Sequence, residues 1–551
     1  METTKIEEIL ETIAVRYRGP GGAVAVLQHG AVVGQRVWGW ADMNERIALT
    51  AETQMPICSI TKQFVCALLL DLYRNPTPAM AARGEDIPQQ FSDQLKELLP
   101  ALFRNTANSD KLTIETLCGM HSGLRDYWAM TTLWGAKPED EFLVARDGPG
   151  AMARTRSLMF DTGTEYSYSN VNFYVVARAI ERVTGEPLDQ LLAERVLRPA
   201  GMKTAFLCPN TAHHPPPCVG YEGGEVAGYQ AAVNRMEWAG DAGLVASLTD
   251  MIAWEKHLET LFADPDSWYR RTVYQPQTYA DGITPAHYHY GMAHVDVEGV
   301  DSLGHGGALR GYRLHRRHAP SEHLSVVVLF NHEADASAAV DDILRAVLNR
   351  PTNSLATPTV TASADWAGVY LDGETQLAIT VTQGSREGEI KIAYAAHNAP
   401  ETIKLTDPHH GRSRSMHSRI DNDRLSIHRI IENRHLDARR LRLRDEDKSF
   451  TSHAALASIV GDYECADVDS VFHCFGEGAM LYGAFDGYLG RGPATPMRHL
   501  GEDVWALTCP RGLDAPPPGD WTVVLRRDPA GGVTGFTIGC WLARRLEFVK
   551  Q

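Results

Sequence analysis

The chain has 551 residues, of which 44% are hydrophobic and 22% are charged, as is typical of a folded protein with a sizeable core. Its formal net charge of −16 disfavours nucleic acids and anionic membranes as partners. Met1 to Leu10 is charged, and no run reaches the roughly 20 apolar residues that a membrane-spanning helix needs. Nine cysteines without a C-x-x-C pair favour reduced thiols, so we expect a cytoplasmic protein.

The histidines do not form a recognisable set of metal ligands. Those that are paired or nearly paired lie among Pro, Gly and charged residues, without partners at metal-binding spacing: His213–His214, His287–His289 and His409–His410. We therefore expect loop histidines, with neither a metal nor an organic cofactor.

The first predicted elements are a β-hairpin and a helix. Two apolar segments, residues 21–28 and 31–38, flank a His-Gly turn signal and predict the hairpin. A helix is predicted over residues 59–73, because an apolar run follows its first turn and an Asn-Pro pair stops it. Residues 75–90 are rich in Pro, Ala and charge, which predicts a surface excursion.

Ser59 and Lys62 open the predicted helix at the S-x-x-K spacing of serine acyl-transfer enzymes. Positions i and i+3 share one face of a helix, and Ser is a good cap at a helix start. An amine in a largely desolvated site loses basicity and can take the proton of the hydroxyl. Taken alone, the same four residues also fit a helix cap followed by a solvated lysine.

Tyr168 and Asn170 form a second candidate site, in a loop before a helix predicted over residues 171–183. They stand two residues apart, so both side chains can face one cleft. A tyrosine near a cationic amine is expected to shift toward phenolate and to relay protons. The alternative is a packed tyrosine beside a helix-capping asparagine.

The Gly-rich segment 303–308 is a third candidate site and precedes a strand predicted over residues 324–330. Glycines beside a strand let a ligand or another backbone approach closely, so His305 can point into the cleft. We expect substrate to contact Gly307 and Ala308, where a backbone N–H can form an oxyanion hole with that of the nucleophile. A plain Gly-rich turn is the alternative.

The last third of the chain shows the alternation of antiparallel β-structure, after a linker predicted over residues 351–363. A second break falls near residues 449–458, and each β-segment opens with Gly-x-Tyr, so two small barrels are predicted. The expected domains are a catalytic domain over 1–350, a first barrel over 364–448 and a second over 458–551.

The second barrel contains a Pro-rich loop, residues 510–519, between two predicted strands. Its prolines stiffen the loop and reduce the entropy lost on ordering it. Its one acid, Asp514, could then reach into a neighbouring domain. A surface hairpin tip is the alternative.

The three motifs occur in one order: Ser59-x-x-Lys62, Tyr168-x-Asn170 and His305-x-Gly307. In this order they resemble the penicillin-recognising serine enzymes, which include class C β-lactamases, DD-carboxypeptidases and related esterases. Together with the two β-segments, the whole chain resembles the bacterial D-aminopeptidase family. Four stretches carry most of this likeness: residues 55–59, 122–128, 304–311 and 539–544.

The resemblance implies an α/β (α+β) catalytic domain like that of β-lactamases and DD-peptidases, followed by two eight-stranded antiparallel barrels. It implies release of an N-terminal D-residue, typically D-Ala, from small peptides and amides, and it suggests a homodimer. By the same likeness Ser59 is the nucleophile, Lys62 its proton acceptor and Tyr168 the relay to the leaving amine. His305, which we also expect to be catalytic, stands where penicillin-binding enzymes usually have Lys. Asn170 is expected to bind substrate, and the loop around Asp514 shapes specificity.

The residues themselves favour an aminopeptidase over a carboxypeptidase. A carboxypeptidase must hold a substrate carboxylate with a fixed cation, whereas His305 is mostly neutral at pH 7. An aminopeptidase must hold a free ammonium, which Asp514 can pair with. The alternatives are an esterase, a β-lactamase, a DD-peptidase or a D-amino-acid amidase of the same fold, and a non-catalytic binding protein, which the presence of all three motifs disfavours.

Overall fold

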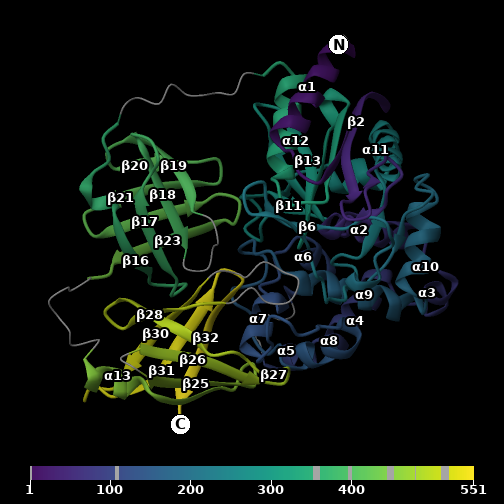
Figure 1. The fold of residues 1–551 in the computed structure, drawn as a ribbon. Coiled ribbons are helices and arrows are strands. Elements are labelled where there is room, and N and C mark those ends of the chain that lie inside the picture. Colours follow the sequence, from purple (N-terminus) through teal and green to yellow (C-terminus); the bar gives the residue numbers. More distant parts are fainter. Residues whose placement is uncertain are drawn as a thin grey trace.

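The computed structural model describes residues 3–105, 111–350, 360–394, 400–442, 452–477, 480–509 and 520–551. It contains an N-terminal domain of helices and a large sheet, followed by two β-barrels, which are green and yellow in Figure 1. In this part of the chain, no helix is long and apolar enough to cross a membrane.

The N-terminal domain is built on an eight-stranded antiparallel sheet. The predicted hairpin is present, and its first strand also pairs, on its other edge, with a strand from much later in the chain. The strands in spatial order are β11 (Tyr288–His289), β12 (Met292–Asp296), β13 (Asp301–Leu309), β14 (Tyr312–Ala319), β15 (Leu324–Phe330), β1 (Gly21–Gln28), β2 (Ala31–Asp42) and β3 (Ile47–Ala48).

The central strands are buried on both faces. Val24 and Val26 of β1 pack in one hydrophobic cluster with two helices, α1 (Thr3–Arg16) and α12 (Ala336–Val347). Ala23 and its alternating neighbours in the strand belong to the opposite cluster, which includes the remaining helices. This two-residue alternation is the expected geometry of a strand between two layers.

The helical part covers that second face of the sheet. Its larger helices are α2 (Thr61–Arg74), α4 (Ile87–Leu98), α8 (Val144–Ala153), α9 (Asn170–Thr184) and α11 (Leu248–Ala263). Shorter helices are α3 (Pro78–Ala82), α5 (Pro100–Asn105), α6 (Ile114–Cys118), α7 (Tyr127–Leu133) and α10 (Leu188–Leu192).

Residues 75–90 lie at the surface, as predicted, since most of them are exposed, and they form α3 and the start of α4. Pro lies in the first helical turn of both helices, where its missing N–H costs nothing. Thr77 caps α3 by accepting a hydrogen bond from the N–H of Met80. Met80 is fully buried and anchors this surface segment to the domain.

The first barrel is closed by pairing between its first and last strands. Residues that alternate along its strands, such as Ile390 and Ile392, fill the interior. Its strands are β16 (Gly368–Asp372), β17 (Ala378–Gln383), β18 (Glu389–Tyr394), β19 (Glu401–Asp407), β20 (His410–Arg412), β21 (Met416–Asp421), β22 (Arg424–Arg429) and β23 (Arg434–Arg440).

The second barrel closes through pairing between β25 and β26, and β27 extends from it as a short hairpin strand. Its strands are β24 (Gly461–Cys465), β25 (Ser470–Glu477), β26 (Met480–Gly487), β27 (Gly490–Arg491), β28 (Thr495–Gly501), β29 (Val504–Leu507), β30 (Trp521–Arg527), β31 (Val533–Cys540) and β32 (Ala543–Lys550).

The repeated Gly-x-Tyr has the same local role in both barrels. Tyr370 on β16 is buried, and its hydroxyl donates to the carbonyl of Asp365 in the turn ahead of the strand. Tyr463 on β24 is also buried, and its hydroxyl donates to the carbonyl of Ile459 at the end of the preceding helix, α13 (His453–Ile459). This shared arrangement agrees with a duplicated module.

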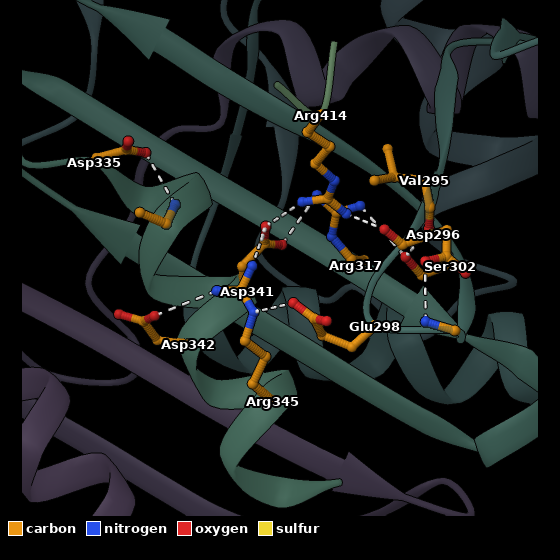
Figure 2. A network of polar contacts seen from close by, with 12 residues as sticks. Val295, Asp296, Glu298, Ser302, Arg317, Asp335, Asp341, Asp342, Arg345 and Arg414 are labelled. Carbon is orange, nitrogen blue, oxygen red and sulfur yellow. Dashed lines mark hydrogen bonds and ion pairs between the residues drawn. The ribbon is translucent and has the colours of Figure 1, made fainter. Parts of the chain in front are cut away.

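Arg414, between β20 and β21, attaches the first barrel to the N-terminal domain (Figure 2). Its guanidinium lies 2.8 Å from the carboxylate of Asp341 on α12 and also donates to the carbonyl of Asp296. Asp341 is flanked by Arg317 at 3.5 Å and Arg345 at 3.8 Å. One carboxylate thus serves three cations, which fixes the barrel against α12.

Glu165 connects all three parts of the molecule. One carboxylate oxygen accepts from Arg434 of the first barrel at 2.7 Å, and the other from Arg544 of the second barrel at 2.9 Å. None of the three side chains is more than 10% exposed. Because Glu165 lies three residues before Tyr168, both barrels brace the loop that carries the second sequence motif.

Replacing Glu165 by Gln is expected to lower the free energy of unfolding by about 3–5 kcal/mol, because two guanidinium groups would stay buried without their shared charge. Urea-induced unfolding measures this change. Glu374→Gln is the matched control, because Glu374 pairs with Arg434 from a carboxylate that is 66% exposed, and its loss should cost at most about 1 kcal/mol. Equal effects of the two variants would contradict a structural role for the buried junction.

Candidate active site

Ser59 lies in a 3-10 turn, Cys58–Ile60, that runs directly into α2. The prediction that Ser59 caps this helix is wrong, because the turn continues as helix and no side chain caps its first residues. The hydroxyl of Ser59 instead accepts a hydrogen bond from the amine of Lys62 at 2.9 Å. Cys58 has φ of 51°, an uncommon conformation for a residue with a side chain and one that clusters at functional sites.

Lys62 is fully buried, and its amine has three hydrogen-bond acceptors. They are the hydroxyl of Ser59, the side-chain oxygen of Asn170 at 2.9 Å and the backbone carbonyl of Asp241 at 2.6 Å. If the amine loses a proton, two hydrogens can keep the bonds to Asn170 and Asp241 while the lone pair faces Ser59. The geometry therefore suits an amine that takes the proton of this hydroxyl.

Burial lowers the pKa of Lys62 to about 8. The nearby carboxylates of Asp241 and Asp126 act in the opposite direction and favour the charged amine. A substantial fraction of Lys62 is consequently neutral at slightly alkaline pH, as the sequence-based argument expects of a general base.

Tyr168 and Asn170 both face the cleft, and Asn170 is not a cap. Asn170 is the first residue of α9, and its amide bridges Lys62 and the carboxylate of Asp126, to which it donates at 3.1 Å. Ser169 precedes it as the cap residue without a side-chain cap bond. Asn170 therefore orients the amine of Lys62 and does not cap the helix.

The expectation that Tyr168 shifts toward phenolate is wrong, because burial raises the pKa of this phenol well above its usual value. A hydrogen bond with Ser59 opposes the rise without overcoming it. The amine of Lys62 lies 4.9 Å from the centre of the Tyr168 ring, over its face. Tyr168 is therefore a neutral hydroxyl that can donate a proton beside Ser59.

His305 on β13 lines the same cavity and is neutral, as the sequence predicted. Burial lowers its pKa to about 3. Because one ring nitrogen contacts the carbonyl of Gly306, that nitrogen must carry the hydrogen, and the other accepts from the hydroxyl of Tyr288 at 2.9 Å. His305 thus has fixed partners on both nitrogens and offers no fixed positive charge.

Gly307 lets β13 pass closely beside the nucleophile turn. A Cβ atom at this position would lie 2.4 Å from the carbonyl oxygen of Ile57. Of its two neighbouring strands, β13 pairs with β12 only as far as Gly304 but with β14 as far as Leu309, so residues 305–309 pair on one edge only. The segment that holds Ala308 therefore follows the cavity edge next to Ser59.

Four acids that the sequence reasoning missed also line this cavity: Asp126, Asp241, Glu333 and Asp335. Asp126 caps α7 and accepts from the N–H of Trp128, while burial raises its pKa to about 7. Asp241 accepts from the hydroxyl of Tyr127, and burial raises its pKa as well. Asp126 lies in the stretch 122–128 that carries part of the family resemblance, but no motif spacing assigned a role to it or to the other acids.

The cavity has a volume of about 560 Å³ and receives a wall from the second barrel. Leu542, in the turn between β31 and β32, lines it, and its carbonyl accepts from the N–H of Asp126 at 3.0 Å. The guanidinium groups of Arg429 and Arg544 lie over the ring of the adjacent Trp541, 4.5 and 4.7 Å from its centre. The other large apolar wall residues are Trp128, Met236, Trp238, Leu309 and Leu314.

The structure brings together all the predicted site residues that it describes: Ser59, Lys62, Tyr168, Asn170, His305, Gly307 and Ala308. Asp514 and its Pro-rich loop lie outside the described residues. Residues 539–544 carry part of the family resemblance, but the sequence analysis assigned them no role. The structure places Leu542 of this stretch at the cavity.

Comparisons with known proteins agree with this arrangement. A family profile described as "Beta-lactamase" matches residues 5–350, and one described as "D-aminopeptidase, domain B" matches residues 359–549. The octameric penicillin-binding protein homologue from Pyrococcus abyssi shares the fold, with a TM-score of 0.54 at 16% identity over 80% of this chain and 100% of that one.

The similarity to curated proteins extends over nearly the whole chain. A protein named D-aminopeptidase from Brucella suis biovar 1 is 40% identical over 546 residues, which cover 99% of this chain and 98% of that protein. The protein of the same name from Brucella anthropi is 40% identical over 547 residues, with the same coverage. The chain therefore belongs to the D-aminopeptidase family, hydrolases of the β-lactamase-like serine class with two antiparallel β-barrels behind the catalytic domain.

Proposed function

We propose that this chain releases an N-terminal D-residue, preferably D-Ala, from small peptides, amides and esters through an acyl-enzyme on Ser59. The observation that carries this proposal is one cavity lined both by Ser59, whose hydroxyl is bonded to the Lys62 amine behind it, and by the buried carboxylate of Asp126. The Ser59–Lys62 pair can carry out acyl transfer, and the carboxylate of Asp126 can pair with the free ammonium of a substrate. The D preference rests on the relatives named D-aminopeptidase.

In the first step, the neutral amine of Lys62 takes the proton of the Ser59 hydroxyl, whose oxygen attacks the substrate carbonyl. The backbone N–H groups of Ser59 and Ala308 are proposed to stabilise the resulting oxyanion. Tyr168, protonated at neutral pH, gives its proton to the leaving amine and regains one from the Lys62 ammonium. The acyl–Ser59 ester and a free amine result, with Lys62 neutral again.

In the second step, water attacks the acyl ester. The same groups act in reverse order: a proton leaves the water for the base, and Ser59 recovers its proton as the ester bond breaks. The products are a free D-amino acid and the resting enzyme. His305 takes no proton in this scheme, because its two nitrogens already have partners and it is neutral over the working pH range.

The alternatives within the same fold differ in which end of a substrate they hold. A DD-peptidase removes a C-terminal residue and needs a cation for the terminal carboxylate. The cavity does contain Arg313, but this guanidinium already pairs with Glu333 at 3.1 Å, and the cavity also presents Asp126 and neutral His305. Incubation with D-Ala-Gly and Gly-D-Ala, followed by product analysis, tests this distinction. We expect cleavage of D-Ala-Gly and not of Gly-D-Ala. In the same assay with N-acetylated peptides, cleavage at the C-terminal residue would favour a DD-peptidase.

Asp126 is proposed to pair with the substrate ammonium, and Asp126→Asn tests this role. Asn is also a good helix cap, so α7 should persist. We expect kcat/KM for D-alanine methyl ester to fall roughly 100-fold, because a buried charge would lose its partner, and to change little for the N-acetylated ester. Equal losses on both esters would contradict the pairing.

Asp514 is a second proposed partner for the ammonium, and Asp514→Ala is assayed on the same two esters. If the loop that carries Asp514 holds the amine, this variant loses activity on the free ester selectively. Activity retained in Asp514→Ala and lost in Asp126→Asn would assign ammonium pairing to Asp126 alone.

The pH dependence of kcat/KM reports the base. Because burial lowers the pKa of Lys62 to about 8, the neutral amine forms as pH rises through this value, and the rate should rise with it. The substrate amino group, whose pKa is about 8, loses its charge in the same range, so the free D-alanine ester should show a maximum near pH 8. A rising limb centred near pH 6.5 would instead indicate a histidine base.

We also propose a homodimer in the cytoplasm. The cytoplasmic location is supported by the nine cysteines, which are buried and form no disulfide in the described residues, as expected in a reducing compartment. The dimer rests on the family resemblance, and light scattering of the full-length protein measures it directly.

A further inference from the structure

Three segments bring metal-ligating side chains together on the side of the sheet covered by α11. His29 lies in the turn between β1 and β2, His323 directly precedes β15, and Glu259 lies on α11. One ligand atom from each of the three side chains can be chosen such that all lie within 4.8 Å of one another. None of the three residues lines the Ser59 cavity.

The backbone fixes the two histidines relative to each other. The N–H of His29 donates to the carbonyl of His323 at 2.8 Å, at the end of the paired strands β1 and β15. Both residues have φ of 50°, and their rings stack with centres 4.6 Å apart. The imidazole of His323 reaches Glu259, with 2.5 Å between Nδ1 and a carboxylate oxygen.

A second layer of contacts orients Glu259. Its other carboxylate oxygen lies 3.2 Å from Nε2 of His318, and Nδ1 of His318 lies 2.9 Å from the hydroxyl of Tyr269. His318 and Tyr269 are fully buried, so the carboxylate has a rigid support behind it. Supported carboxylates of this kind are typical of metal sites, where the outer contacts aim the ligands.

We infer that His29, Glu259 and His323 form a Zn²⁺ site. Two imidazoles and one carboxylate match the ligands that zinc takes in proteins, and a water can complete a tetrahedron. Ligand bonds of about 2.0–2.2 Å would place the three ligand atoms about 3.3 Å apart, so binding requires the side chains to shift from their present positions, in which these atoms lie within 4.8 Å of one another. Glu259 is 18% exposed and the side chain of His323 is 42% exposed, which leaves the ion a path from solvent.

The ion would join three pieces of chain that are distant in sequence: the first hairpin turn, the connection into β15, and α11. Binding to the folded state alone stabilises that state, so the expected role is structural. This role is independent of the proposed peptidase activity, and its test does not use activity as a readout.

Calorimetric titration of the full-length, metal-free protein with Zn²⁺ tests the site, with Co²⁺ absorption as a check on coordination. We expect one strong equivalent of Zn²⁺ and a rise in melting temperature on binding. His29→Asn, His323→Asn and Glu259→Gln should each weaken this equivalent at least tenfold. Asn is chosen because it tolerates positive φ, and Gln keeps the shape of Glu259.

The matched control is the double variant His428→Gln and His435→Gln. These histidines form another cluster, on β22 and β23, with rings stacked 4.1 Å apart, and they are the obvious competitor for a surface metal ion. The control should keep the strong Zn²⁺ equivalent and its melting shift. The absence of saturable binding, its persistence in all three site variants, or its loss in the control would each overturn the inference.

Discussion

Replacing Ser59 by Ala is expected to abolish turnover while the fold persists. The Lys62 amine hydrogen-bonds to no other hydroxyl among the described residues, and the nearby phenol of Tyr168 is a poor nucleophile because burial raises its pKa. No group is therefore left to carry the acyl intermediate, and kcat should fall by roughly 10⁴-fold or more. Lys62 would keep its bonds to Asn170 and to the Asp241 carbonyl, which is why the site should stay folded. Steady-state rates and a melting curve measure the two parts of the prediction.

Ser167→Ala is the matched control for that variant. Ser167 is also a buried serine, one residue from Tyr168, and its hydroxyl has no hydrogen-bond partner among the described residues. Its removal should leave kcat within a few-fold of wild type. An active Ser59→Ala protein, or one in which mass spectrometry still finds the acyl group, would rule out Ser59 as the nucleophile.

Replacing Lys62 by Met is the variant with the second largest expected effect. Met has a similar length and removes the only amine that touches Ser59 among the described residues, so kcat should fall by about 10³- to 10⁴-fold. The acyl-enzyme should form slowly, since the hydroxyl loses its proton acceptor. The alkaline rise in rate assigned to the Lys62 pKa should disappear with the amine.

Stopped-flow assays with D-alanine esters separate acylation from deacylation in this variant. Retention of activity within tenfold, with the wild-type pH profile, would show that another group accepts the proton. Tyr168 is the nearest alternative, but burial raises the pKa of its phenol, which makes it a poor base at neutral pH.

The parts of the fold that the sequence could predict depend on local patterns. The hairpin of β1 and β2 follows from two apolar runs around a turn signal, and the barrels follow from residue alternation along short strands. The Ser59–Lys62 contact follows from one helical turn, even though Ser59 lies in a 3-10 turn instead of the predicted cap position.

The parts that the sequence could not predict depend on contacts between distant residues or on burial. In the sequence, Pro78 indicates the end of a helix, and only the structure shows that it lies in the first turn of α3. The phenol of Tyr168 resists ionisation because its surroundings are dry, which a motif cannot show. Asp126 and Leu542 meet only because the second barrel docks beside α7, so neither could be assigned to the site in advance.

The most direct test of the proposed function compares hydrolysis of D-Ala-p-nitroanilide with that of its L-isomer and its N-acetylated form. We predict fast cleavage of the free D-compound alone, because the proposal requires both a D-residue and an ammonium for the acids of the site. Faster cleavage of the N-acetylated compound, or of a β-lactam or simple ester while the free D-anilide stays intact, would contradict the assignment and move the enzyme to its hydrolase relatives.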